Sequence, residues 1–117
     1  MKNILITGGA GYIGAHVAEV LVKKKKEIFI VDNLSTGFKK LINKKAHYTN
    51  LNILNTPRLK KIIIDNKIDS VIHLAASLSI ELGEKNPSFY YTNNVLGTKS
   101  LLSACTNSLV KNFIFSS

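Results

Sequence analysis

Four glycines lie within seven residues near the start of the chain, in the stretch ITGGAGYIGAH. Gly9, Gly11 and Gly14 fit the spacing G-x-G-x-x-G, and Gly8, Gly11 and Gly14 fit the wider spacing G-x-x-G-x-x-G. An apolar run precedes the glycines and a helical pattern follows them, which is the context that a dinucleotide motif requires. Free N–H groups at a helix start bind phosphate, and glycine lets the phosphate approach the backbone. The motif therefore predicts a pyrophosphate-binding turn, and a purely structural turn is the alternative.

An acidic residue follows the glycines at the distance expected for a dinucleotide site. Asp32 ends a second apolar run, EIFIVD, about 20 residues after the motif. A carboxylate at this place accepts hydrogen bonds from the ribose hydroxyls of NAD and repels the 2′-phosphate of NADP. The glycines and Asp32 together predict a dinucleotide site that favours NAD. The alternative for Asp32 is a cap on the turn that it forms with Asn33.

These residues need a scaffold of alternating strands and helices, and the remaining sequence supplies one. Short apolar runs alternate with stretches in which apolar residues recur at helical spacing. The predicted strands cover 2–6, 27–32, 46–51, 70–74 and 112–116, and the predicted helices cover 12–24, 56–66 and 86–107, with a turn or short helix at 33–40. The alternation predicts an α/β fold, a Rossmann-type doubly wound parallel sheet of five strands.

Local features add detail to two of the helices. Ile13, Val17, Val20 and Leu21 form the predicted apolar stripe of the first helix. Thr56 is the predicted N-cap of the second helix, and a proline follows it at the first helical position.

The chain is strongly basic, with a formal net charge of +9 from fifteen lysines and one arginine against seven acidic residues. Such a charge is compatible with an anionic partner such as nucleic acid. Arginine, which reads bases and binds phosphate through a fork of donors, is nearly absent. We therefore expect no nucleic-acid partner and interpret the lysine run 23–26 as a solvated helix end.

A membrane or secreted location is not expected either. No segment approaches the ~20 apolar residues that cross a bilayer, and no apolar signal region precedes the glycines. The expected location is the cytoplasm. Cys105 is the single cysteine, so no intrachain disulfide is expected, and it is predicted to be a buried structural thiol. The three histidines are scattered, so no metal site is predicted, and His73 is expected to pack at a strand end with a backbone hydrogen bond.

Five stretches of the chain together resemble a known family. In chain order they are TGGAGYIGAH, VDNLSTG, VIHLAA, NPSFYYTNNVLGT and VKNFIFSS. They are similar to the N-terminal part of the UDP-glucose 4-epimerases, within the extended short-chain dehydrogenase/reductase group of NAD-dependent sugar-nucleotide epimerases and dehydratases. The resemblance covers essentially the whole chain. The glycine motif is common to the whole group, whereas NPSFYYTNNVLGT and KNFIFSS favour the 4-epimerases.

The resemblance implies which residues bind the cofactor. Those for the pyrophosphate are Gly8, Gly11, Tyr12, Ile13 and Gly14, and those for the adenosine ribose and its phosphate side are Asp32, Asn33, Leu34, Ser35, Thr36 and Gly37. Those for the adenine are Asn52 and Ile53, those beyond the fourth strand are Leu74, Ala75, Ala76, Ser77 and Leu78, and that for the nicotinamide half is Asn93.

Two of these positions depart from the family pattern. The family usually has aspartate at the position of Asn52. An asparagine carbonyl can still accept a hydrogen bond from the adenine amino group, so we expect weaker binding there. Some close bacterial members have lysine at the position of Leu78, near the diphosphate and the sugar, and its absence bears on the identity of the substrate.

The resemblance also implies a reaction, in which UDP-glucose and UDP-galactose interconvert by transient oxidation at C4 to a 4-keto intermediate, with NAD as the cofactor. Its catalysts are a tyrosine with a lysine four residues later, and a serine or threonine. None of the four tyrosines has a lysine at that spacing, and the family places all three groups after Ser117. We therefore expect residues 1–117 to be a truncated NAD-binding Rossmann domain, inactive alone, without its remaining strands and substrate domain.

The expected partners are a nucleotide-sugar substrate, bound through the missing part, and a second copy in a homodimer of the full-length protein. Two alternatives stay open. One is an NAD-dependent sugar-nucleotide dehydratase or decarboxylase of the same group, and the other is a stand-alone NAD-binding module without catalysis.

Overall fold

The computed structural model describes residues 1–34, 39–74, 88 and 92–115. A parallel sheet forms its centre, with the strand order β3-β2-β1-β4-β5. The strands are β1 (Asn3–Thr7), β2 (Glu27–Asp32), β3 (His47–Asn50), β4 (Ser70–His73) and β5 (Asn112–Phe115). All five predicted strands are confirmed, and their ends differ from the prediction by no more than one residue.

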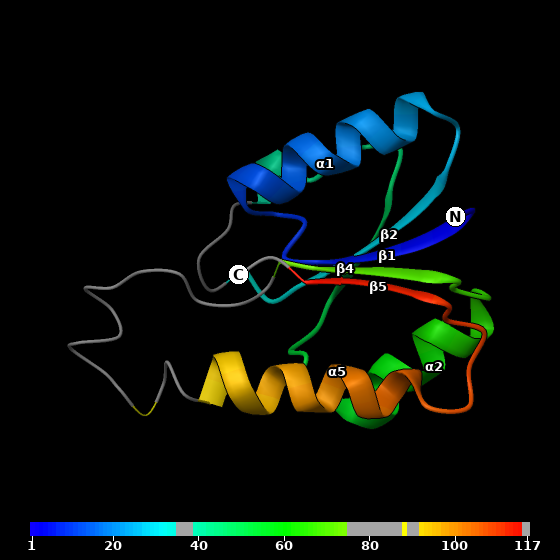
Figure 1. Ribbon diagram of the computed structural model, residues 1–117. Coiled ribbons are helices and arrows are strands. Elements are labelled where there is room, and N and C mark those ends of the chain that lie inside the picture. Colours follow the sequence, from blue (N-terminus) through cyan, green and yellow to red (C-terminus); the bar gives the residue numbers. More distant parts are fainter. Residues whose placement is uncertain (35–38, 75–87, 89–91, 116–117) are drawn as a thin grey trace.

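Helices cover both faces of the sheet (Figure 1). α1 (Tyr12–Lys23) lies on one face, and α2 (Thr56–Asp65) and α5 (Gly97–Cys105) lie together on the other. A 3-10 turn, η1 (Lys39–Leu41), lies between β2 and β3, and a π-helix, η2 (Thr92–Leu96), leads directly into α5. This arrangement is the predicted Rossmann-like α/β fold.

The central strands are apolar because helices bury the sheet from both sides. Ile4, Leu5 and Ile6 of the central strand β1 are fully buried. Side chains alternate along a strand, so Ile4 and Ile6 join the core under α1 while Leu5 joins the core under α2 and α5. β1 is thereby fixed between two cores, and the glycine loop that follows it starts from a rigid position.

The buried face of α1 differs from the predicted stripe. Gly14 and Ala18 are its fully buried residues, whereas Ile13 and Val20 are 55% and 53% exposed. The prediction was wrong for Ile13 and Val20. The other two predicted residues, Val17 and Leu21, do pack against the core under α1. Small side chains allow the helix to lie close to the sheet, so the closest contacts come from residues that hydrophobicity alone does not single out.

The N-cap of α2 is Asn55 rather than the predicted Thr56. The Asn55 Oδ1 atom accepts a hydrogen bond from the Arg58 backbone N–H at 3.3 Å. Thr56 is instead the first helical residue, and its hydroxyl lies 2.5 Å from the Ser100 hydroxyl of α5. Asparagine and threonine both favour the N-cap position, so the packing of α2 against α5 decides which of them occupies it.

The last predicted helix, 86–107, is described at residue 88 and from Thr92 onward. It ends at Cys105, two residues earlier than predicted, because Thr106 is extended and Asn107 has a left-handed φ of 58°. Cys105 is half-buried and packs against the core under α2 and α5, where burial raises the pKa of its thiol. This setting agrees with a structural role.

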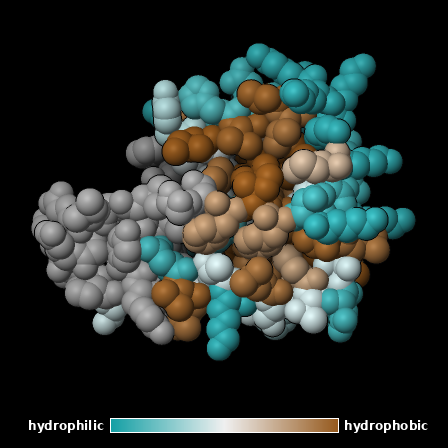
Figure 2. Space-filling model, in the orientation of Figure 1, coloured by the Kyte–Doolittle hydropathy of each residue, from teal (hydrophilic) through white to brown (hydrophobic). Residues whose placement is uncertain are grey.

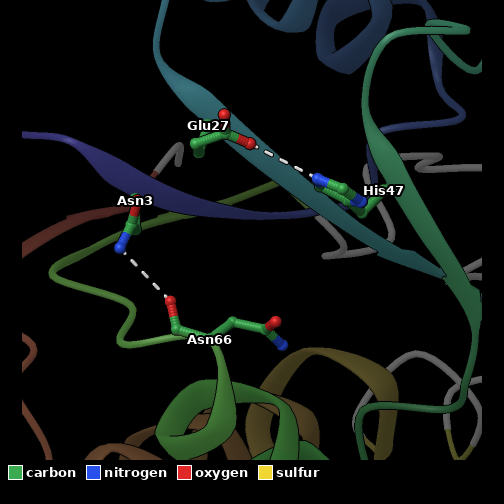
Figure 3. Close-up of polar contacts among 4 residues, drawn as sticks. All are labelled: Asn3, Glu27, His47 and Asn66. Carbon is green, nitrogen blue, oxygen red and sulfur yellow. Dashed lines mark hydrogen bonds and ion pairs between the residues drawn. The ribbon is translucent and has the colours of Figure 1, made fainter.

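Side chains at the amino edge of the sheet tie the starts of the strands together. The Asp69 carboxylate accepts hydrogen bonds from the backbone N–H groups of Lys2 at 3.0 Å and Asn3 at 2.9 Å. The Asn3 side chain donates to the Asn66 carbonyl oxygen at 3.3 Å (Figure 3). These bonds connect the start of β1 to the turn before β4, at the end of the sheet opposite the glycine loop.

β5 forms one edge of the described sheet, beside β4. Its residues Ile114 and Phe115 are 48% and 49% exposed. Figure 2 shows hydrophobic residues as a band across the middle of this face, with hydrophilic residues above and to the right. Within the described residues, this edge therefore presents apolar side chains and unpaired backbone groups.

Candidate functional site

The carboxyl edge of the sheet collects the residues singled out in the sequence. The chain passes from β1 outward to β2 and β3 and then returns to β4 on the other side of β1. Ligands of doubly wound sheets bind where the strand order reverses in this way. The glycine loop follows β1, Asp32 ends β2, and Asn52 follows β3, so all three lie at this edge. In Figure 1, β1 and the neighbouring β4 run from right to left, toward this edge.

The glycines of the loop differ in whether a Cβ atom would fit at their position. A Cβ atom on Gly14 would lie 2.3 Å from the Gly8 carbonyl oxygen, and one on Gly9 would lie 2.5 Å from Ile30 Cγ2. A Cβ atom on Gly11 would meet no described atom closer than the Gly8 oxygen at 3.4 Å, an ordinary contact. The packing of the described chain therefore requires glycine at positions 9 and 14 but not at 11. The open side of Gly11 is the cradle that a phosphate approaching the backbone needs.

The N-terminus of α1 supplies hydrogen-bond donors beside this opening. Gly11 is the N-cap and has no side chain that could satisfy them. The Ala15 N–H bonds to the Gly11 carbonyl at 2.9 Å, so the N–H groups of Tyr12, Ile13 and Gly14 have no partner within the helix. The first turn contains no acidic residue, and the helix dipole is positive at this end. The helix start therefore suits an anion such as a pyrophosphate.

The Asp32 carboxylate connects the glycine loop to the turn after β2. Its Oδ2 atom accepts a hydrogen bond from the Ala10 N–H at 3.0 Å, and its Oδ1 atom accepts one from the Leu34 N–H at 2.6 Å. Asp32 thus caps the turn, as the alternative prediction stated, and also holds the glycine loop. Each carboxylate oxygen has a second lone pair, so Asp32 can still accept hydrogen bonds from ribose hydroxyls.

The loop after β3 is held from two sides. The Asn52 side chain accepts a hydrogen bond from the Leu54 N–H at 2.9 Å. The Ser100 hydroxyl of α5 donates to the Ile53 carbonyl at 2.6 Å, and the Ile53 side chain is buried in the core. Ile53 can therefore meet a ligand through its backbone, whereas the exposed Asn52 side chain can meet one directly.

His73, at the end of β4, is fully buried and bonds to two hydroxyls. The Thr98 hydroxyl donates to the Asn94 carbonyl at 2.7 Å, so it must accept its hydrogen bond from His73 Nε2 at 3.0 Å. Nε2 therefore carries the ring hydrogen, and Nδ1 accepts from the Thr7 hydroxyl at 2.6 Å. The expected backbone partner was wrong, because side chains of β1 and α5 take that role. The ring joins Thr7, the residue before the glycine loop, to Thr98 at the start of α5.

Acidic pH is expected to weaken this network and destabilise the fold. Burial lowers the pKa of His73, so the folded state binds fewer protons than the unfolded state, in which the pKa is about 6.5. The free energy of unfolding is then highest above that pH and falls by about 1 kcal/mol between pH 7.5 and 5.5. Urea unfolding at the two pH values measures this fall, and the variant His73→Gln should lack it.

His47 is the matched control for this prediction. Its Nε2 atom lies 3.3 Å from Glu27 Oε2 on the exposed amino part of the sheet (Figure 3). His47→Gln should therefore keep the fall in stability below pH 6.5, since a solvated ion pair contributes little. An equal fall in wild type and His73→Gln would contradict the role of His73.

The remaining predicted residues are only partly described. The Leu74 N–H donates to the Thr7 carbonyl at 2.9 Å, which continues the pairing of β4 with β1. The Asn33 side chain is exposed next to Asp32, and Asn93 belongs to the π-helix η2. Outside the described residues lie Ser35, Thr36, Gly37, Ala75, Ala76, Ser77, Leu78 and the side chain of Asn93.

Several residues that hold the site together were not predicted. Ala10 acts through its backbone N–H, which leaves no trace in the sequence. Thr7, Thr98 and Ser100 act through hydroxyls that face buried partners. The one available signal is a hydroxyl residue at the end of an apolar strand or among the small residues of a helix.

The arrangement as a whole fits a dinucleotide. It combines N–H donors without a partner in their helix, an opening at Gly11, a carboxylate on the neighbouring strand and an exposed amide one strand further on. The described residues contain no group of three or more His, Cys, Asp or Glu side chains that could hold a metal ion. Their helices are also too short or too polar to cross a membrane.

Comparison with known proteins agrees with this geometry. The model of the NAD dependent epimerase/dehydratase family matches residues 4–117. A UDP-glucose 4-epimerase of Lactobacillus helveticus is 42% identical over 115 residues, which are 98% of this chain and 35% of that protein. One of Klebsiella pneumoniae is 38% identical, over 98% of this chain and 88% of the matched sequence. The chain thus spans about a third of the length of the first relative.

Solved structures similar to this chain are also UDP-glucose 4-epimerases. The UDP-glucose 4-epimerase of Thermotoga maritima, determined with UDP-glucose, has a TM-score of 0.95 and 36% identity, over 98% of this chain and 37% of that one. The UDP-glucose 4-epimerase of Brucella ovis, determined in complex with NAD, has a TM-score of 0.93 and 38% identity, over 100% of this chain and 36% of that one.

Proposed function

Because this chain belongs to the NAD dependent epimerase/dehydratase family, we propose that residues 1–117 form the NAD-binding domain of a UDP-glucose 4-epimerase. The observation that carries the proposal is the opening at Gly11 beside the N–H groups of α1 that have no partner within the helix, with the Asp32 carboxylate on the neighbouring strand. The relatives of Lactobacillus helveticus and Schizosaccharomyces pombe, at 42% and 36% identity, are named UDP-glucose 4-epimerases, which supports this activity over a dehydratase or decarboxylase.

Each part of the cofactor has residues suited to it in this proposal. The N–H groups of Tyr12, Ile13 and Gly14 receive the pyrophosphate, and Asp32 receives the ribose hydroxyls. The loop with Asn52 and Ile53 receives the adenine, with Asn33 to Gly37 along the adenosine phosphate. The residues after β4, from Leu74 to Leu78, and Asn93 of η2 receive the nicotinamide half.

When bound, NAD supplies the acceptor and donor of the hydride at the sugar C4. The residues described above position that cofactor, and the network of Thr7, His73 and Thr98 links β1, β4 and α5 next to the glycine loop. The tyrosine, the lysine and the serine or threonine of the family reaction are not among these 117 residues. We further propose a UDP-sugar substrate, a cytoplasmic location and a homodimer for the protein that carries this domain.

A domain exchange tests the proposal. Residues 1–117 replace the matching segment of the Lactobacillus helveticus relative, and the chimera is assayed for interconversion of UDP-galactose and UDP-glucose. We expect activity that is lost when Gly11→Ala is added, because the change fills the phosphate cradle. A folded chimera that binds NAD but remains inactive would contradict the epimerase assignment, and one that does not bind NAD would contradict the cofactor site.

Asp32 should determine the preference for NAD over NADP. Its carboxylate repels a 2′-phosphate by about 1 kcal/mol or more at ~4 Å. Asp32→Asn removes the charge and should raise the affinity for NADP relative to NAD by about tenfold, measured by calorimetric titration of the folded variant. Asp65→Asn, which removes an exposed carboxylate of α2, is the control and should leave the ratio unchanged. If Asp32→Asn left the ratio of the NADP and NAD affinities unchanged, the 2′-phosphate would not bind near Asp32.

A further inference from the structure

The polarity of the Asn52 side chain is fixed by the turn that it forms. Its Oδ1 atom accepts from the Leu54 N–H at 2.9 Å, and its backbone carbonyl accepts from the Asn55 N–H at 2.9 Å. A backbone N–H can bond only to the oxygen end of an amide. The carbonyl end of the side chain is therefore held against the loop, and the exposed end is the Nδ2 donor.

The loop that carries Asn52 is rigid. The Ser100 hydroxyl donates to the Ile53 carbonyl at 2.6 Å, and the Thr56 hydroxyl in turn donates to Ser100 at 2.5 Å. Leu51 and Ile53, on either side of Asn52, are 3% and 6% exposed and belong to the core. The hydrogen bond to Leu54 and these anchors leave the amide little freedom to turn its oxygen outward.

The position of this donor points to the base of the dinucleotide. The pyrophosphate cradle follows β1 and the ribose carboxylate ends β2, so the base extends toward the end of β3, where Asn52 lies. Adenine presents an amino group, a donor, at its position 6, whereas hypoxanthine presents a carbonyl oxygen, an acceptor. A fixed N–H donor complements the acceptor and not the amino group.

We propose that Asn52 is a specificity-determining residue that relaxes the discrimination against 6-oxopurine dinucleotides at the cofactor site. The inference rests on the proposed NAD site. It replaces the expectation that the Asn52 carbonyl accepts from adenine, because the hydrogen bond to the Leu54 N–H orients that oxygen toward the loop and the Nδ2 donor outward. An aspartate at the same position would keep one oxygen on Leu54 and present its second oxygen, an acceptor, to the adenine amino group.

The test compares NAD with nicotinamide hypoxanthine dinucleotide, in which a 6-oxo group replaces the amino group. Both dissociation constants are measured by calorimetric titration of the 117-residue chain and of Asn52→Asp. We expect wild type to bind the two within about threefold, and Asn52→Asp to shift the ratio toward NAD by at least about tenfold, the contribution of one hydrogen bond. Circular dichroism verifies that the variant is folded, and its carboxylate can form the same turn.

Asn43 provides a matched control. It forms the same turn, with the Lys45 N–H on its Oδ1 atom at 2.9 Å and the Ala46 N–H on its carbonyl at 3.1 Å. It precedes β3 and so lies toward the amino edge, away from the proposed site. Asn43→Asp adds the same charge in the same local geometry and should leave the ratio unchanged.

Each remaining outcome has one meaning. A strong preference of wild type for NAD that Asn52→Asp does not change would overturn the role of Asn52 and leave the NAD site standing. An equal shift in Asn43→Asp would attribute the effect to charge alone and would also overturn it. Failure of wild type to bind either dinucleotide would overturn the proposed function, and the inference with it. Asn52→Ala covers the case of an unfolded Asn52→Asp, because it deletes the donor and should also shift the ratio toward NAD.

Discussion

Gly14→Ala is expected to lose a substantial part of the stability of the fold. The added Cβ atom would lie 2.3 Å from the Gly8 carbonyl oxygen and 2.8 Å from the Gly9 Cα atom. Both are backbone atoms of a loop fixed by the Asp32 carboxylate, so neither can move aside without disrupting the turn. Overpacking of this kind costs about 3 kcal/mol, against a total stability of about 5–15 kcal/mol for a domain. Urea unfolding followed by circular dichroism measures the loss.

Gly11→Ala is the natural control for stability. Its Cβ atom has room at 3.4 Å from the nearest described atom, and Gly11 has a φ of −80° that alanine adopts freely. We expect a change below about 1 kcal/mol, because the substitution acts only on the N-cap of α1. Equal losses in the two variants would show that the tight contact at Gly14 relaxes at little cost.

The same Gly11→Ala variant is expected to lose NAD binding while it stays folded. The methyl group would occupy the open side of the loop, where the pyrophosphate has to approach the N–H groups of α1. Displacing the phosphate gives up charge-assisted hydrogen bonds worth about 1.5–3 kcal/mol each, which corresponds to a loss of about 100-fold in affinity. Calorimetric titration with NAD measures it.

Adenosine is the matched ligand for this second prediction, because it lacks the pyrophosphate. Its weak binding, followed by NMR, should be equal in wild type and Gly11→Ala, since the proposed contacts at Asp32 and Asn52 are unchanged. Undiminished NAD binding by Gly11→Ala would mean that the cofactor does not approach the backbone at this residue.

The fold was predictable because its signals are local and repeated. Short strand-like runs that alternate with helical stretches indicate a parallel sheet, and helices on both faces of that sheet explain why the central runs are continuously apolar. The spacing of Gly9, Gly11, Gly14 and Asp32 identified the edge of the sheet that holds the site. These features depend on residue type and distance along the chain.

The features that could not be predicted depend on contacts between distant segments. The choice of Asn55 over Thr56 as N-cap follows from the contact of Thr56 with Ser100, 44 residues away. The polarity of the Asn52 amide follows from the backbone conformation of one loop. The packing of α1 through Gly14 and Ala18 follows from the closeness of a helix to a sheet. None of these three contacts can be read from the types and spacing of the residues in the sequence.

The order of the strands also has a consequence for the speed of folding. β1 pairs with β2 across a single helix, whereas its pairing with β4 joins segments such as Thr7 and His73, 66 residues apart. Closing that longer loop costs more entropy before any contact compensates for it, and sheets dominated by such distant pairings fold in milliseconds to seconds. The unit from β1 to β2, with the glycine turn inside it, should therefore form first, and the joining of β4 should limit the rate.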